Sequence, residues 1–168
     1  MADEAIIPLK PEAPIINPVS EVSSSLDPIE TDIVRQELLS RAQRRSSARV
    51  AQIKLFDDAT AATTGDGRFI FFVPPELDNL DLFDVYAYVT TVSSSGALTI
   101  QVRNVTDTVD MLSTAITIDQ SEFSSLTAAT PPVINNLYSR VSSGDRIALD
   151  VDGAGTGTTG LGVVLTFN

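Results

Sequence analysis

The chain has 168 residues and a formal net charge of −11, and it contains no cysteine, histidine or tryptophan. Without cysteine there is no disulfide, thiolate nucleophile or zinc–thiolate site, and without histidine the usual general base and the commonest metal ligand are missing. A serine–histidine catalytic triad is therefore excluded. Nucleic acid and anionic membrane surfaces repel so acidic a chain as a whole. We expect a protein that is not an enzyme and that has no cofactor and no metal ion.

The length predicts one compact domain with appendages. No apolar run reaches the roughly 18 residues of a bilayer-spanning helix, so no membrane span is expected. The acidic start lacks the charged-then-apolar order of a signal peptide, which predicts a protein made without that route of export.

Residues 1–49 are predicted to form an extended arm followed by a helix. Prolines recur between Pro8 and Pro18, and they favour extended chain because each fixes φ and lacks an amide donor. The segment is too apolar for a solvated linker. Its candidate contact residues are Ile6, Ile7, Leu9, Ile15, Ile16 and Val19. We expect them on a neighbouring subunit, and the alternative is an arm folded back on its own domain.

The helix is predicted over about residues 28–46. Asp27 can cap its amino terminus, and Pro28 suits the first helical position, where no amide partner is lost. Val34 and Leu38 are four residues apart and begin a short apolar stripe. The stripe is too short for a coiled coil.

Three arginines, Arg41, Arg45 and Arg49, are spaced by four and share one side if the helix extends that far. Six basic residues fall within residues 35–54, whereas residues 55–168 hold 4 basic and 14 acidic residues. The arginines form either a solvated basic face or a contact with acidic protein surface, such as another copy of the chain. Nucleic acid is a third interpretation, which the overall charge disfavours.

From residue 50 the pattern changes to alternating apolar and polar residues with turn signals between the runs, which predicts seven or eight strands. The main expected strands are 50–56, 68–73, 82–92, 98–103, 111–118, 146–151 and 161–167. This spacing is typical of an all-β fold, an antiparallel β-sandwich or jelly-roll-like domain over residues 50–168. The third and fourth strands are expected to pair as a hairpin. Phe69, Phe71 and Phe72 are expected to supply much of the core.

Two surface features are candidates for binding. Tyr86 and Tyr88 share one face of a predicted strand and suit an interface or a sugar site, unless that strand is buried on both faces. The carboxylates of Glu76, Asp78, Asp81 and Asp84 crowd one loop. They form either a solvated acidic rim or, as the alternative, the carboxylate pair of a glycoside hydrolase.

Asp150-Val151-Asp152-Gly153 begins like a calcium-binding loop, but no later carboxylate follows to complete it. A strand end followed by a glycine turn is the simpler interpretation. A carboxylate from elsewhere in the chain would be needed for a calcium site, and this alternative stays open. The glycines that follow lack the lysine and the strand–loop–helix context of a phosphate-binding loop.

Several segments carry a family resemblance when they are taken in order. They are Gly65-Asp66-Gly67, Ala87-Tyr88-Val89-Thr90-Thr91, Thr99-Ile100-Gln101-Val102-Arg103-Asn104, Ser143-Gly144-Asp145-Arg146-Ile147 and Gly160-Leu161-Gly162-Val163-Val164-Leu165. Together, residues 67–167 resemble a β-sandwich domain of tailed-bacteriophage virion proteins, of the capsid decoration, cement or head-fibre class. Members of that class bind surfaces and carry no active site.

The resemblance implies a structural protein on the outer surface of the virion capsid. Its expected partners are the major capsid protein and further copies of itself, with no nucleic acid and no membrane. A homo-oligomer is expected, and a trimer would match the threefold positions of a shell lattice. The alternative function is a head- or tail-fibre adhesin that recognises a host glycan or surface protein.

Overall fold

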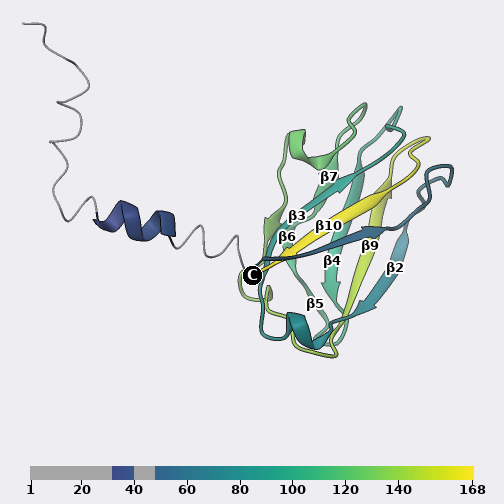
Figure 1. Cartoon of the computed structure of the whole chain (residues 1–168). Coiled ribbons are helices and arrows are strands. Elements are labelled where there is room, and N and C mark those ends of the chain that lie inside the picture. The colour runs from purple at the N-terminus through teal and green to yellow at the C-terminus, as the bar shows by residue number, and fades with distance from the viewer. Residues whose placement is uncertain (1–31, 40–47) are drawn as a thin grey trace, which may run out of the picture. The chain divides into compact units, whose positions relative to one another are not determined.

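The computed structural model describes residues 32–39 and 48–168 (Figure 1). The chain divides into two compact units, Met1–Ala42 and Gln43–Asn168. In the first unit the described part is one short helix, residues 32–39, which confirms the middle of the predicted helix. The rest of the predicted helix lies outside the described residues. No helix in the described residues is long and apolar enough to cross a membrane.

The helix 32–39 buries none of its side chains within the described structure. Its large apolar residues are 50–60 % exposed, and they are Ile33, Val34, Leu38 and Leu39. Tertiary packing of an apolar face supplies most of the stability of short helices in proteins.

Residues 48–168 form an antiparallel β-sandwich, which confirms the predicted class (Figure 1). One sheet has the order β1 (Arg49–Lys54), β10 (Gly162–Phe167), β3 (Leu82–Tyr88). The other has the order β2 (Gly65–Phe72), β9 (Arg146–Ala154), β4 (Leu98–Asn104), β5 (Val109–Asp110), with β7 (Ile116–Ile118) also paired with β4. A two-stranded sheet joins β6 (Leu112–Thr114) to β8 (Val133–Ile134), and the 3-10 helices are η1 (Pro75–Leu77) and η2 (Ser125–Thr127).

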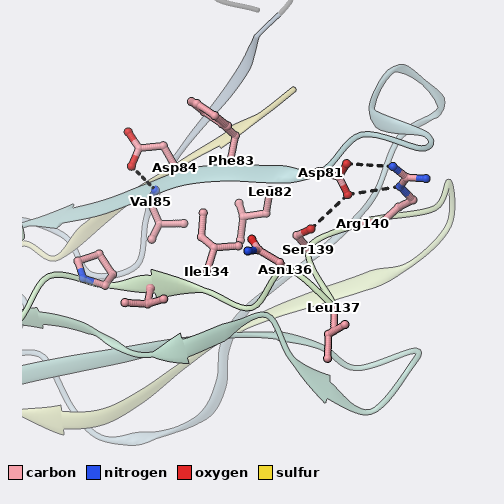
Figure 2. Close-up of a pocket in the computed structure, with 12 residues that line it drawn as sticks. Asp81, Leu82, Phe83, Asp84, Val85, Ile134, Asn136, Leu137, Ser139 and Arg140 are labelled. Atoms are coloured by element: carbon pink, nitrogen blue, oxygen red, sulfur yellow. Dashed lines mark hydrogen bonds and ion pairs between the residues drawn. The ribbon is translucent and has the colours of Figure 1, made fainter.

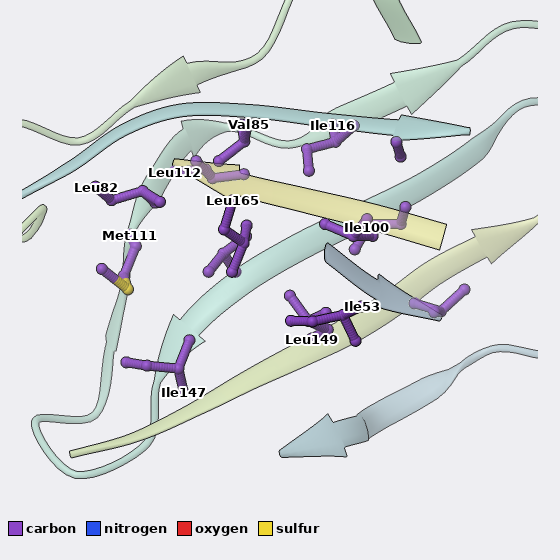
Figure 3. Packing of buried hydrophobic residues seen from close by; sticks show 14 of the residues in the cluster. Ile53, Leu82, Val85, Ile100, Met111, Leu112, Ile116, Ile147, Leu149 and Leu165 are labelled. Carbon is purple, nitrogen blue, oxygen red and sulfur yellow. The ribbon is translucent and has the colours of Figure 1, made fainter. Parts of the chain in front are cut away.

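Alternation along the strands builds the core. Ile147, Leu149 and Val151 of β9 are buried on the inner face, and each is at most 1 % exposed. In β10, Leu165 and Phe167 point inward in the same way. Figure 3 shows side chains from both sheets meeting in this interior. Burial of these alternating apolar faces is the main force that holds the two sheets together.

The predicted hairpin is wrong, because β3 and β4 lie in different sheets. β3 pairs with β10, and β4 pairs with β9, β5 and β7. The connection is held by the buried hydroxyl of Ser93, which accepts a hydrogen bond from the Thr156 amide at 3.0 Å. Ser94 N also donates to Thr156 O, at 2.9 Å. These bonds tie the turn to a distant loop instead of closing a local hairpin.

Residues 111–118 hold two short strands where one was expected. The segment divides into β6 and β7, and these pair with β8 and β4 respectively. Met111 and Ile116 are fully buried, whereas Ser113 between them is exposed.

The three phenylalanines of β2 do not supply the bulk of the core. Only Phe71 packs against it, while Phe69 is 36 % exposed and Phe72 is 68 % exposed. The reason is that β2 forms an end of its sheet, so its side chains are covered on one flank only. The fully buried aromatic side chain of the core is Phe167, which is surrounded by aliphatic residues.

Candidate functional site

An open groove lies along β3, between that strand and residues 132–140 (Figure 2). Its volume is about 910 Å³. At one end Leu82 N donates to Ser139 O at 2.7 Å, and at the other Ala87 N donates to the Ser125 hydroxyl at 2.9 Å. β10 pairs with one edge of β3. Within the described residues no strand pairs with the other edge between these two bonds, so the groove marks a gap along that edge.

A β-bulge in β3 shapes the wall of the groove. The pairing of β3 with β10 shifts at Phe83, so Phe83 and Asp84 both lie exposed on the outer side of the strand (Figure 2). Leu82 and Val85 point inward toward Ile134. The Val85 amide is capped by the Asp84 carboxylate at 2.9 Å. Asp84 thereby satisfies an amide that has no backbone partner in this gap.

One end of the groove is charged. The Arg140 guanidinium donates to both carboxylate oxygens of Asp81, at 3.3 and 3.0 Å, and the Ser139 hydroxyl donates to the same carboxylate at 3.2 Å. The hydrogen bond from Arg140 lowers the pKa of Asp81, although partial burial opposes the effect. The carboxylate is therefore ionised and neutralised by its partner, which makes it a poor proton donor.

Three exposed apolar side chains also border the groove, beside the polar Asp84 and Asn136. Phe83 is 59 % exposed, Val133 is 50 % exposed and Leu137 is 84 % exposed. The Leu137 amide donates to the Asn135 side-chain oxygen at 3.2 Å, and this local turn holds the leucine outward. Three large apolar side chains around one hollow are a feature of protein-binding surfaces.

Sequence reasoning missed these three apolar residues. Exposure of Phe83 depends on a bulge that no local pattern signals. For Leu137, the preceding Asn135-Asn136 pair was a usable turn signal, because asparagine side chains readily bond to the backbone two residues on.

Tyr86 and Tyr88 lie on the outer face of the sheet β1-β10-β3 and are half-buried. The Tyr88 ring covers Gly162 of β10 and its hydroxyl accepts a hydrogen bond from Gln52 of β1 at 2.8 Å. Lys54 lies 5.6 Å from the ring centroid. Tyr88 therefore bridges the three strands of its own sheet, and the role of both tyrosines at an interface stays a prediction.

The contact between Tyr88 and Gly162 predicts a coupled effect. A Cβ at Gly162 would lie 2.3 Å from Tyr88 Cζ, so Gly162→Ala should push the ring away and break its bond with Gln52. We expect Gly162→Ala to lower the free energy of unfolding by about 1 kcal/mol or more. In the Tyr88→Ala background the same change should be nearly neutral. Urea denaturation of the four proteins measures the coupling, and additive effects would contradict the packing.

The predicted arm contacts, from Ile6 to Val19, lie outside the described residues, as do Arg41 and Arg45. Arg49 is described: it begins β1, is exposed, and lies opposite Phe167 of β10. Arg49 is part of a strand, so the prediction that it shares one helical face with Arg41 and Arg45 is wrong.

Three of the four crowded acidic residues act as local acceptors. Besides Asp81 and Asp84, Asp78 accepts the Ser143 amide at 2.8 Å. Glu76 is exposed in η1. These uses suit an acidic rim that supports nearby turns.

Asp150 and Asp152 lie on the outer face of β9. Asp150 is buried and accepts the Gly67 amide at 2.5 Å, which fixes the irregular start of β2. Among the described residues no group of three or more carboxylates is placed to hold a metal ion. Partial desolvation of the largely exposed Asp152 carboxyl raises its pKa, and the charges of Asp150, Asp66 and Asp110 raise it further.

The raised pKa of Asp152 predicts a pH-dependent stability. A carboxyl group whose pKa is higher in the folded than in the unfolded state stabilises the fold while it is protonated. This stabilisation is complete below pH 3.8, the ordinary pKa, and it is lost as the pH rises through the higher pKa of the folded state. Asp152→Asn should therefore increase the free energy of unfolding at pH 7, by less than about 1 kcal/mol because the side chain is exposed. The gain should vanish below pH 3.8. Denaturant titrations at pH 3 and pH 7 test this, and a loss at pH 7 would refute it.

Comparisons with known protein families, curated proteins and solved structures found no match to this chain.

Proposed function

We propose that the protein is a non-enzymatic structural protein that binds the capsid surface of a tailed bacteriophage. In this proposal the groove beside β3 docks an apolar segment of the shell protein. The observation that supports it best is the exposed apolar rim formed by Phe83, Val133 and Leu137 around an open hollow. The resemblance in the order of sequence segments supports the choice of a virion.

The polar groups of the groove favour binding over chemistry. Arg140 and Ser139 bind Asp81 and lower its pKa, which makes it a poor proton donor, and the Asp84 carboxylate is engaged in capping a backbone amide. The bidentate ion pair also offers a fixed polar end that orients a docked segment. The apolar rim supplies affinity and the polar end supplies direction, as in many protein interfaces.

The groove needs to supply only modest affinity. Burial of a fully exposed large apolar side chain contributes roughly 1.5–3 kcal/mol. The three rim residues are already partly covered, so their complete burial gives roughly 3–6 kcal/mol before the cost of association. A weak single contact suffices on a shell, because binding of a linked or oligomeric protein at repeated positions adds avidity.

Co-sedimentation with purified phage heads tests the proposal. Leu137→Ser combined with Val133→Ser should weaken binding at least tenfold and leave the melting temperature unchanged, because both side chains are exposed. Val50→Ser is the matched control: Val50 is 65 % exposed and belongs to β1, outside the groove. Equal binding of the groove variant and the control would reject the groove. Failure of the wild-type protein to bind heads, together with binding to host glycans, would support the adhesin alternative.

A further inference from the structure

The outer edge of β2 is open, since β2 ends its sheet and pairs only with β9 among the described strands. Val73 N donates to Asp145 O at 2.8 Å, and Gly144 N donates to Val73 O at 2.8 Å. The backbone groups of Val73 therefore face the β9 side. Because alternate residues of a strand direct these groups to opposite sides, those of Ile70 and Phe72 face the open edge.

The edge is apolar on both faces of the sheet. Phe69 lies opposite Leu149 on the inner face, and Ile70 and Phe72 belong to the outer face. The exposed fractions are 36 % for Phe69, 48 % for Ile70 and 68 % for Phe72. Residues 68–73 contain no lysine, proline or acidic residue, which are the usual protections of a free edge. An edge of this kind can pair with an extended backbone segment, which adds a strand to the sheet.

We propose that β2 pairs with β2 of a second copy of this chain, in antiparallel orientation about a twofold axis at Ile70. This register places Ile70 opposite Ile70 of the second copy and Arg68 opposite Phe72 of the second copy. Pro74, which has no amide to donate, then lies beyond the ladder. A register shifted so that Pro74 enters the ladder would lose hydrogen bonds, because proline has no amide to donate.

Side-chain complementarity favours a second copy as the partner. Arg68 is the one charged residue within 68–73, and this register keeps the two copies of it at opposite ends of the ladder. Each arginine instead lies opposite a phenylalanine of the second copy. Its guanidinium, which donates to the Thr64 carbonyl of its own chain, would have to turn toward that ring to form a cation–π contact. On the inner face, Phe69 lies opposite Phe71 of the second copy. Aromatic cross-strand pairs of this kind stabilise antiparallel sheets, and they would extend both cores across the axis.

The pairing goes beyond the proposed function and does not depend on it, because it concerns the protein alone in solution. The net charge of −11 on each chain opposes the pairing, because two chains of like charge repel each other at low ionic strength. We therefore expect dimer formation to strengthen as salt is added, up to physiological ionic strength.

Substitutions at Phe72 test both the pairing and its register. Phe72→Lys places a lysine opposite Arg68 of the second copy, so it should weaken the dimer at least tenfold relative to Phe72→Glu, which offers that arginine an opposite charge. Sedimentation equilibrium of the full chain measures the three dissociation constants, and the Leu137→Lys control should dimerise as the wild type does. A monomeric wild type would overturn the pairing, and equal dimerisation of the lysine and glutamate variants would overturn the register.

Cross-linking gives an independent reading of the axis, because the chain has no cysteine of its own. Ile70→Cys should form a disulfide-linked dimer under mild oxidation, since directly opposed residues of an antiparallel pair lie within disulfide reach. Leu137→Cys, at a residue that is 84 % exposed and outside β2, should stay largely uncross-linked. Equal cross-linking at the two positions would overturn the proposal.

Discussion

Replacement of Phe167 by alanine is expected to lower the free energy of unfolding by about 3–5 kcal/mol. The side chain is fully buried in the core, and the residue lies between Leu82 of β3 and Arg49 of β1 in the register of its sheet. The loss combines the transfer of the ring to water with the cavity that remains, because the strands on both sides limit collapse. Domains of this size are stable by only about 5–15 kcal/mol.

Phe123→Ala is the matched control, because Phe123 is 62 % exposed. Its backbone oxygen accepts a hydrogen bond from the Val89 amide, just after β3, and alanine keeps that bond. Its effect should stay within about 0.5 kcal/mol. Urea denaturation of both variants measures the difference, and Phe167→Ala should also lower the melting temperature by on the order of 10 °C. Similar losses for the two variants would contradict the position of the core.

Asn104→Ala is expected to lower the free energy of unfolding by about 2–3 kcal/mol. Asn104 is 1 % exposed, and its amide nitrogen donates to Asp145 at 3.0 Å and to Asp107 at 2.9 Å. Its oxygen accepts the amides of Thr106 and Asp107, at 3.0 and 3.2 Å. Alanine would leave these partners unsatisfied at a site that water reaches poorly, and each such group costs about 1–3 kcal/mol.

Two further variants isolate the cause of that loss. Asn136→Ala removes an exposed asparagine and should change stability by less than about 0.5 kcal/mol. Asn104→Asp keeps the shape of the side chain but places a third carboxylate beside Asp107 and Asp145. Its loss should be larger at pH 7 than at pH 4, where carboxylates begin to protonate. Chemical denaturation at both pH values measures this, and a loss that is independent of pH would contradict the network.

The sequence predicted the fold where local alternation suffices. Ile147, Leu149 and Val151 alternate with polar or small residues, and this pattern alone identifies the buried face of a strand. It does not identify the partner of the strand, which is why β3 was paired with its neighbour β4. The true partner of β3 is β10, more than 70 residues along the chain, and that choice depends on how both sheets share one core.

The candidate site was the harder part to predict. Phe69, Phe71 and Phe72 read as a core strand, because an edge strand with apolar residues on both faces has the same local pattern as a central buried one. The groove arises from a bulge at Phe83 and from a turn at Asn135, and these features meet only in the folded chain. Tyr86 and Tyr88 share one face of β3, as predicted, but the bond between Tyr88 and Gln52 joins strands far apart in sequence.

A cryo-electron microscopy map of intact phage heads tests the central claim most directly. The proposal predicts density for the sandwich of residues 48–168 at regular positions over the outer shell, in a simple ratio to the shell protein. The rim of Phe83, Val133 and Leu137 should face that shell. Density for the protein at the tail alone, or a shell without it, would contradict the proposal.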